Sequence, residues 1–178
     1  MTERSNRIYS LWLVPRADTT AYRRLKTTIT ELAAEHEDAP VFEPHITVVG
    51  GIDSERTVLK ETTQTLANQT DPLTVAVEGV RWSTTRHQCV FLAVEPTLEL
   101  GELHQSARKA VNKPSTAYHP HLSLIYSEMD LAERRDIARS IDMAMLPDSL
   151  TCQSLALVDT TGAESEWETV VSVRLSDP

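Results

Sequence analysis

The chain has 178 residues, of which 40% are hydrophobic, and a formal net charge of −9. That length can bury a core, so we expect residues 1–178 to form a single domain made of two closely joined lobes. The acidic charge argues against a protein that binds the backbone of long nucleic acids. No apolar stretch approaches the roughly 20 residues that span a bilayer, and the polar first residues lack the layout of a signal peptide. We therefore expect a cytoplasmic protein with no membrane partner and, by default, a monomer.

Strands and helices alternate through the first half of the chain. A strand is predicted at residues 7–14, a helix up to about residue 36, a strand at 45–49 and a helix up to about residue 67. Asp18 or Thr19 is expected to cap the first helix, and Asp53 or Ser54 the second. The side-chain oxygen of such a residue can accept a hydrogen bond from an unpaired N–H group of the first helical turn.

The second half opens with two long strand signals, at residues 73–82 and 87–95, whose connection suits a hairpin. A helix at 98–111, a strand at 119–126, a helix at 131–143 and strands at 151–159 and 167–175 follow. The whole order is β-α-β-α-β-β-α-β-α-β-β, which predicts an α+β protein. Cys89 and Cys152 lack metal-ligand spacing, and we expect two buried free thiols.

One short phrase occurs twice, as Pro44-His45-Ile46-Thr47-Val48 and as Pro120-His121-Leu122-Ser123-Leu124. Each copy lies in a predicted strand between two predicted helices, which indicates an internal repeat. Because side chains alternate along a strand, the histidine and the hydroxyl residue of each copy share one face, about 7 Å apart. The repeat therefore predicts two similar lobes, each with an antiparallel sheet and outer helices. Their inner faces would bring two imidazoles and two hydroxyls into one central cleft.

These side chains suit acid–base chemistry on a phosphate. The pKa of histidine, near 6.5, lets one ring accept a proton while the other donates one, so His45 and His121 are predicted as the catalytic pair. Thr47 and Ser123 can donate hydrogen bonds to phosphate oxygens as charge develops on them. The arrangement favours hydrolysis of a phosphodiester, a reaction for which it needs no cofactor and no metal.

A metal site is the competing interpretation of the histidines. His119 and His121 share a strand face, with His87 expected nearby, but no carboxylate or cysteine completes a ligand set at a familiar spacing. We therefore predict no metal site, and expect His119 to act beside the phosphate or to be structural. His36 and His104 fall on predicted helices and are expected to be surface or structural residues.

The paired H-x-[TS] motifs resemble those of the two-histidine (2H) phosphoesterase superfamily. Within it, the chain most resembles the cyclic phosphodiesterases of plants and yeast. The supporting blocks are residues 9–15 (YSLWLVP), 42–48 (FEPHITV), 88–92 (QCVFL), 118–126 (YHPHLSLIY) and 167–170 (WETV). The resemblance implies the bilobal 2H fold and the opening of a cyclic phosphate on a ribose. The implied reactions convert ADP-ribose 1″,2″-cyclic phosphate to ADP-ribose 1″-phosphate, and nucleoside 2′,3′-cyclic phosphates to 2′-phosphates.

The same resemblance implies roles for individual residues. His45 and His121 would form the acid–base pair, with His121 as the base on water and His45 as the acid on the leaving ribose oxygen. Thr47 and Ser123 would hold the phosphate. Tyr126 matches a tyrosine that lies near the phosphate or the water.

Three further residues are candidates to contact a base or a phosphate. Trp12 and Trp167 offer rings on which a base could stack. Plant members of the family carry aromatic residues just before the QCVFL block, where this chain has Thr85-Arg86-His87. Arg86 could therefore meet a phosphate there, or stack by its guanidinium plane.

Two other functions stay open from the sequence. An RNA 2′,3′-cyclic phosphodiesterase or 2′–5′ RNA ligase-like enzyme would need a basic track beside the cleft, and the acidic charge favours a small nucleotide as the partner instead. A cyclic-nucleotide-binding module without turnover is the second alternative. The presence of both histidines and both hydroxyl residues favours an active enzyme.

Overall fold

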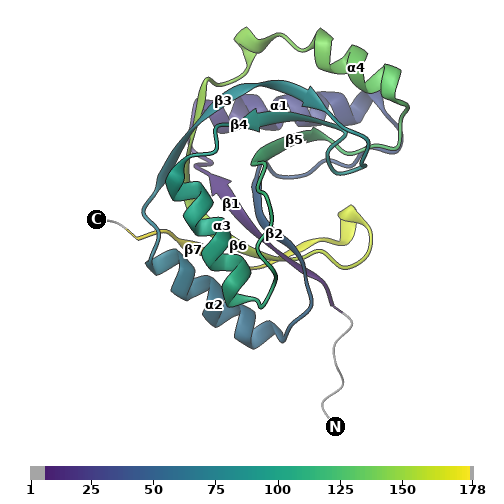
Figure 1. The fold of residues 1–178 in the computed structure, drawn as a ribbon. Coiled ribbons are helices and arrows are strands. Elements are labelled where there is room, and N and C mark those ends of the chain that lie inside the picture. Colours follow the sequence, from purple (N-terminus) through teal and green to yellow (C-terminus); the bar gives the residue numbers. More distant parts are fainter. Residues whose placement is uncertain (1–6, 177–178) are drawn as a thin grey trace.

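The computed structural model describes residues 7–176, and its elements follow the predicted order (Figure 1). The strands are β1 (Tyr9–Pro15), β2 (Ile46–Ile52), β3 (Leu73–Trp82), β4 (Val90–Val94), β5 (His121–Ile125), β6 (Ser149–Asp159) and β7 (Glu168–Arg174). The helices are α1 (Thr20–Glu35), α2 (Arg56–Asn68), α3 (Leu98–Ala110) and α4 (Leu131–Ser140), with short 3-10 turns η1 (Met143–Met145) and η2 (Glu164–Glu166). No helix within the described range is both long and apolar enough to cross a membrane.

The strand boundaries differ from the prediction next to the two repeated motifs and in the hairpin. His45 immediately precedes β2, and β5 begins at His121, two residues later than predicted. Pro44 and Pro120 have no N–H group to donate to a strand neighbour, so regular pairing begins only after them. In the hairpin, β4 begins at Val90, which leaves residues 83–89 in the β3–β4 loop.

The helix boundaries also differ from the prediction in places. Thr19 caps α1, as predicted, because its side chain accepts a hydrogen bond from the N–H group of Tyr22. The cap of α2 is Glu55, and neither Asp53 nor Ser54 has that place. The last predicted helix ends at Ser140 and is followed by the separate turn η1.

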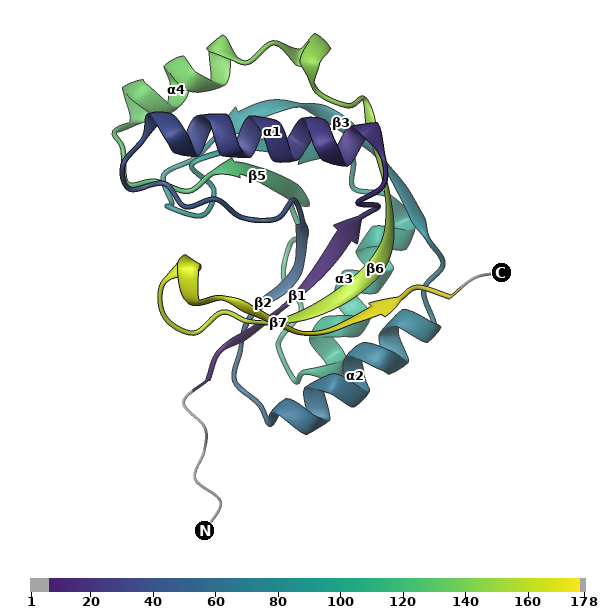
Figure 2. The same ribbon diagram turned by 180° about the vertical axis from the view of Figure 1, so that it is seen from behind.

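The seven strands form one antiparallel sheet in the order β1-β2-β5-β4-β3-β6-β7. Because β1 also pairs with β6, the first six strands of that order close into a ring. One lobe contains β1, β2, β6 and β7, covered by α2 and α3. The other contains β3, β4 and β5, covered by α1 and α4 (Figures 1 and 2). The predicted α+β fold of two lobes with outer helices is confirmed.

The two repeats exchange their leading helices. α1 precedes β2 in the chain but packs against β5, whereas α3 precedes β5 but packs against β2. The helices that follow the motif strands stay in the same lobe, α2 against β6 and β7 and α4 against β3 and β4. Neither half of the chain therefore builds a lobe without the other.

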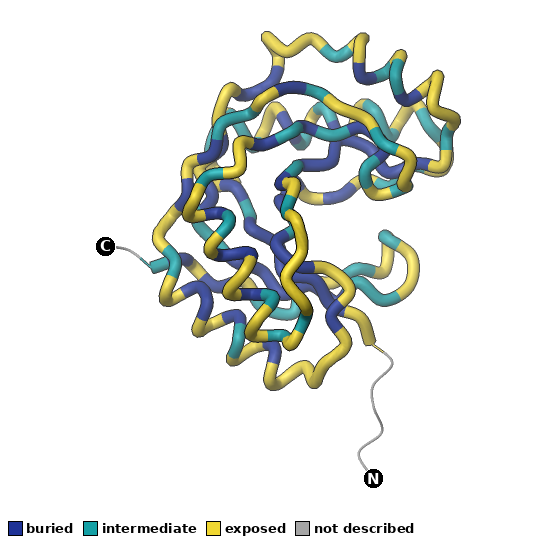
Figure 3. Tube along the Cα trace, viewed as in Figure 1, coloured by how far each residue is buried: buried dark blue, intermediate teal, exposed yellow. Residues whose placement is uncertain are grey.

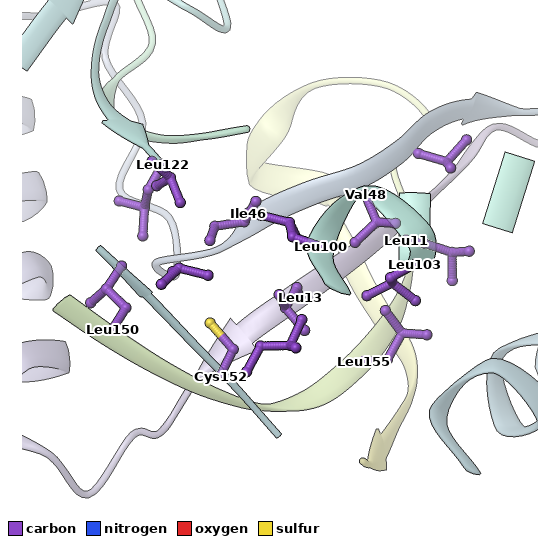
Figure 4. Close-up of a cluster of buried hydrophobic side chains, with 14 of the residues drawn as sticks. Leu11, Leu13, Ile46, Val48, Leu100, Leu103, Leu122, Leu150, Cys152 and Leu155 are labelled. Atoms are coloured by element: carbon purple, nitrogen blue, oxygen red, sulfur yellow. The ribbon is translucent and has the colours of Figure 1, made fainter. Parts of the chain in front are cut away.

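The two motif strands meet at one residue pair, Ile46 and Leu122. Both side chains are 0% exposed and belong to the main core, together with Leu11 and Leu13 (Figure 4). Figure 3 shows that the buried residues gather along the strands and that the outer helices carry many exposed residues. Neighbouring residues in a strand point to opposite faces, so the histidine and the hydroxyl residue of each motif face away from this core. The antiparallel register across the pair sets the histidine of each motif opposite the hydroxyl residue of the other.

The cysteines and one buried arginine complete the interior. Cys89 and Cys152 are buried and free, as predicted. Arg134 on α4 is 2% exposed. Its guanidinium donates hydrogen bonds to four carbonyl oxygens at 2.8–3.0 Å. The acceptors are Ser83 and Thr85 in the β3–β4 loop, and Ser127 and Met129 just after β5. This side chain fixes the loop that follows β3 against the segment that follows β5.

Replacement of Arg134 by Met should lower the free energy of unfolding by about 3 kcal/mol, because several buried carbonyl oxygens lose their donor at once. Urea denaturation would measure the loss. The matched control is Arg135→Met, since Arg135 is exposed and pairs only with its exposed neighbour Asp136. That control should change stability by less than about 0.5 kcal/mol. Equal stability of the two variants would contradict the anchoring role.

Candidate active site

The inner faces of the two lobes form a cleft of about 410 Å³. The five residues predicted to act on the phosphate all line it, namely His45, Thr47, His121, Ser123 and Tyr126. A somewhat larger groove, of about 490 Å³, lies between α1 and the η1 region, but its lining contains no histidine and no cysteine. The cleft is therefore the candidate site for acid–base chemistry.

The ring of His45 is held from three directions. Its Nδ1 lies 2.7 Å from the carbonyl oxygen of Glu43, so the Nδ1–H group donates there and the neutral ring keeps Nε2 as its acceptor. Trp12 stacks on the ring with centroids 3.6 Å apart. The hydroxyl of Tyr126 lies 3.3 Å from Nε2. The side chain is thereby fixed with Nε2 directed at the cleft.

The ring of His121 has a matching arrangement. Its Nδ1 lies 2.9 Å from the carbonyl oxygen of His119, again the residue two positions earlier. In both motifs the intervening residue is proline, which keeps the preceding residue extended. The side-chain amide nitrogen of Gln88 lies 3.2 Å from each of the two ring nitrogens of His121. The two repeated motifs thus hold their histidines in the same tautomer, with Nε2 as the acceptor in both neutral rings.

Burial lowers the pKa of both histidines. The pKa of His45 is lowered to about 4, because burial disfavours the charged ring and the nearby His121 adds to the effect. The hydrogen bond to Glu43 opposes this shift. Burial also lowers the pKa of His121 below its ordinary value near 6.5. Both rings are therefore neutral at pH 7 in the free protein, and an anion bound between them would favour protonation of either one.

The hydroxyl groups differ in their present partners. Ser123 donates a hydrogen bond to the carbonyl oxygen of His87 at 2.7 Å, so its hydroxyl must rotate to reach a phosphate. Thr47 has no side-chain hydrogen bond to any residue in the range 7–176. Tyr126 is buried and stacks on Phe42, and burial raises the pKa of its phenol, so it stays protonated as a donor.

Two tryptophans form an aromatic side of the cleft. Trp12 and Trp167 both line it, with ring centroids 5.9 Å apart. One face of Trp12 is already covered by His45, and the residue is buried. Trp167 is half-buried and follows η2 in the β6–β7 loop. Stacking on a base therefore stays a prediction, for which Trp167 is the more accessible ring.

The guanidinium of Arg86 forms a bridge and does not line the cleft. Its Nε donates to the carboxylate of Glu164 at 2.8 Å, and one terminal nitrogen lies 3.1 Å from a carboxylate oxygen of Asp38. The hydrogen bond to Glu164 raises the pKa of Arg86 above its ordinary value. The bridge joins the loop after α1, the β3–β4 loop and the β6–β7 loop. This geometry does not support the predicted contact of Arg86 with a phosphate or a base.

The other histidines lie outside the catalytic pair. The side chain of His119 is exposed and does not line the cleft, although its carbonyl oxygen orients His121. His104 is buried and structural, with Nδ1 2.7 Å from the carbonyl oxygen of Val48. Among the described residues, no three His, Cys, Asp or Glu side chains are grouped so that they could hold a metal ion.

Several lining residues were not predicted from the sequence. Gln88 was placed on a strand, whereas it lies in the β3–β4 loop, where no strand face determines its direction. Ser10 alternates with Trp12 on β1, so period-two counting alone could have found it. Thr160 follows the end of β6, and no local pattern marks it.

Comparison with known proteins places this geometry in a family. The family model described as "Cyclic phosphodiesterase-like protein" matches residues 8–175. The chain belongs to the cyclic phosphodiesterase-like protein family. A cyclic phosphodiesterase of Arabidopsis thaliana is 29% identical over 183 residues, which cover 99% of each chain. A 2′,3′-cyclic-nucleotide 3′-phosphodiesterase of Yarrowia lipolytica is 26% identical over 212 residues, covering 93% of this chain and 98% of the relative.

Solved structures agree with the family in their fold. The structure of E. coli LigT complexed with NADP+ has a TM-score of 0.62 at 14% identity, covering 96% of this chain and 98% of LigT. A crystal structure described as a phosphoesterase has a TM-score of 0.63, also at 14% identity, covering 97% of this chain and all of the other. At such low identity the likeness shows the fold alone. Family and fold together make this member of the cyclic phosphodiesterase-like family a hydrolase of the 2H phosphoesterase superfamily.

Removal of the Arg86 bridge should loosen the β6–β7 loop of this cyclic phosphodiesterase-like protein. In Arg86→Met, Glu164 and Asp38 lose their shared cation, so amide hydrogen exchange in residues 160–167 should become at least about tenfold faster. Arg81→Met is the control, because Arg81 is an exposed arginine on β3 of the same hairpin, without a carboxylate partner in the described chain. Unchanged exchange in Arg86→Met would show that the loop is held by other contacts.

Proposed function

We propose that this protein hydrolyses a cyclic phosphate on a ribose without a metal, using two histidines as acid and base. The substrates are ADP-ribose 1″,2″-cyclic phosphate, which gives ADP-ribose 1″-phosphate, and nucleoside 2′,3′-cyclic phosphates, which give nucleoside 2′-phosphates. The observation that carries the proposal is the pair of matched imidazoles, His45 and His121, both with Nε2 available in one cleft. The names of the Arabidopsis and Yarrowia relatives, which refer to cyclic phosphodiesters, support it.

The proposed reaction uses each ring once. Nε2 of His121 takes a proton from water as the water oxygen attacks phosphorus. The bond from phosphorus to one ribose oxygen breaks, and His45, protonated at Nε2, gives its proton to that oxygen. The products are a phosphate monoester and a free hydroxyl, with the proton now on His121, and exchange with solvent restores the starting state.

The phosphate itself supplies the charge that this cycle needs. The pKa of His45 is lowered to about 4 in the free protein, so its ring must gain a proton when the substrate binds. A cyclic phosphate carries one negative charge, which stabilises an adjacent imidazolium and raises its pKa. Thr47, Ser123 and Tyr126 can donate hydrogen bonds to the non-bridging oxygens as further charge develops there.

Hydrolysis should be measured in EDTA with ADP-ribose 1″,2″-cyclic phosphate and the four nucleoside 2′,3′-cyclic phosphates, with phosphorus NMR used to locate the phosphate in each product. We expect the wild-type protein to produce ADP-ribose 1″-phosphate from the first substrate and nucleoside 2′-phosphates from the others. His45→Ala and His121→Ala should each lower kcat/KM by about 10²- to 10⁴-fold, the usual contribution of a general acid or base. His36→Ala is the control and should keep full activity, because His36 follows the end of α1 and does not line the cleft.

Three results would overturn parts of this proposal. No turnover on any of these substrates would exclude the small-nucleotide reaction, and RNA ends would then be the next substrates to assay. Loss of activity in EDTA, restored by a divalent cation, would exclude the metal-free mechanism. Near-full activity of either histidine variant would exclude the acid–base pair.

The pH dependence follows from the lowered pKa values. Since one ring must be neutral and the other protonated, kcat/KM should peak below about pH 6.5 and fall as rising pH removes the proton of the acid. The optimum of kcat should lie at higher pH, because the bound phosphate anion raises the histidine pKa values. Rates with uridine 2′,3′-cyclic phosphate, whose base does not titrate in this range, would measure both profiles. A kcat/KM that stays constant from about pH 6.5 to 8 would contradict the assignment.

A further inference from the structure

One end of the cleft is lined by hydroxyl groups and by the peptide groups of two glycines. Ser10, Thr160, Gly50 and Gly51 line it there. The Ser10 and Thr160 hydroxyl oxygens lie 3.2 Å apart, and Ser10 is only 7% exposed, so its position is fixed by packing. Gly50 and Gly51 have no side chains, so a ligand can approach the peptide groups of β2 directly.

This end adjoins the catalytic pair. Ser10 and Trp12 lie on the same face of β1, two residues and therefore about 7 Å apart. Trp12 pairs across the sheet with Thr47 and stacks on His45. A Cβ atom built on Gly50 would lie 3.6 Å from the hydroxyl oxygen of Ser10 and 3.7 Å from the methyl group of Thr47. The hydroxyl-lined end thus begins immediately beyond the proposed phosphate position.

A lysine ammonium group lies behind this end. A Cβ atom built on Gly51 would be 3.6 Å from Nζ of Lys113, and Gly51 lines both the cleft and the adjoining cavity that contains Lys113 and Asp53. Gly51 has φ +63°, a left-handed conformation that glycine adopts without strain, so the position favours a residue with no side chain between Lys113 and the cleft.

The backbone of Lys113 is itself held in place. Asn112 takes the left-handed conformation, φ 55°, just after α3, and the Lys113 N–H donates to the carbonyl oxygen of Arg108 at 2.8 Å. Such a turn is a common way to end a helix. It directs the chain, and with it Lys113, past Gly51.

The ammonium charge of Lys113 is available to a ligand, whereas the guanidinium charge of Arg86 is already paired. Arg86 is committed to Glu164 and Asp38. Lys113 makes no ion pair and no side-chain hydrogen bond with any residue from 7 to 176, and Asp53 shares its cavity without pairing with it. Gly51 thus lies between this ammonium and the end of the cleft that carries the two hydroxyls. Ammonium, hydroxyl and peptide N–H groups are all donors that bind phosphate oxygens.

We propose that Ser10, Thr160, Gly50–Gly51 and Lys113 form a second anion subsite, which binds the diphosphate of an ADP-ribose-type substrate while its cyclic phosphate lies between the histidines. This inference rests on the proposed function. A nucleoside 2′,3′-cyclic phosphate has no second phosphate and leaves the subsite unused. The subsite therefore discriminates between the two proposed substrate classes.

The test compares two substrates in one variant. Lys113→Ala should lower kcat/KM for ADP-ribose 1″,2″-cyclic phosphate about tenfold or more, mainly by raising KM. A loss of this size corresponds to one charge-assisted hydrogen bond. For adenosine 2′,3′-cyclic phosphate, kcat/KM should stay within about twofold. Lys113→Glu should enlarge the difference. Lys109→Ala is the matched control, an exposed lysine at the end of α3 that lines neither the cleft nor the adjoining cavity.

Two kinetic results would overturn the subsite. Equal losses on both substrates would show that Lys113 acts through the fold or the general field, and no loss on either would show that it contacts no substrate. Ser10→Ala provides a second variant with the same selective loss expected on the diphosphate-bearing substrate.

A binding measurement keeps the two proposals separate. If the wild-type protein hydrolyses neither substrate, the proposed function fails, and calorimetry with ADP-ribose then tests the subsite alone. Weaker binding of ADP-ribose by Lys113→Ala, but not by Lys109→Ala, would support the subsite. Equal binding by all three proteins would overturn it. Inorganic phosphate as a second probe shows whether the site holds any phosphate or requires the whole diphosphate ligand.

Discussion

The contact between Ile46 and Leu122 is the constraint on which the site depends. These two buried side chains are the only paired positions between β2 and β5 in the described chain, and they join the two lobes at the bottom of the cleft. Their burial forces the flanking histidines and hydroxyls to the opposite face. The antiparallel register then places the histidine of each motif opposite the hydroxyl residue of the other motif. If either strand slipped by one residue in this register, the histidine of that strand would turn into the core.

The electrostatic character of the site follows from the same burial. Each imidazole uses Nδ1 on a carbonyl oxygen of its own motif, so both rings reach the cleft as neutral acceptors. Removal from water holds them neutral, so these two histidines bring no fixed positive charge to the cleft. In the proposed reaction, the substrate anion stabilises the proton that makes one ring an acid, so the reactive protonation state forms only when the site is occupied.

How far the sequence could predict this molecule depended on how local each signal was. The element order, the Thr19 cap and the faces of the motif strands follow from periodicity and capping within a few residues. The roles of Arg86 and Gln88 do not, because both lie in a loop whose course is set by Arg134 on α4, about fifty residues away in the chain. The exchange of α1 and α3 between lobes was likewise invisible, since both helices carry the same kind of amphipathic pattern. The internal repeat predicted the two lobes, which the periodicity of single elements left open, and the family resemblance implied the same arrangement.

The ring of strands has a mechanical consequence. β6 pairs with β1 in one lobe and with β3 in the other, so one continuous strand belongs to both lobes. A hinge motion that spread the lobes would have to break hydrogen bonds between β6 and its neighbouring strands, or separate Ile46 from Leu122. The walls of the cleft are therefore rigid, and the parts free to move are the side chains and loops at its rim. Of these, the β6–β7 loop spans from one wall to the other through Glu164. A ligand thus binds in a cleft whose width is already set by the strand pairings.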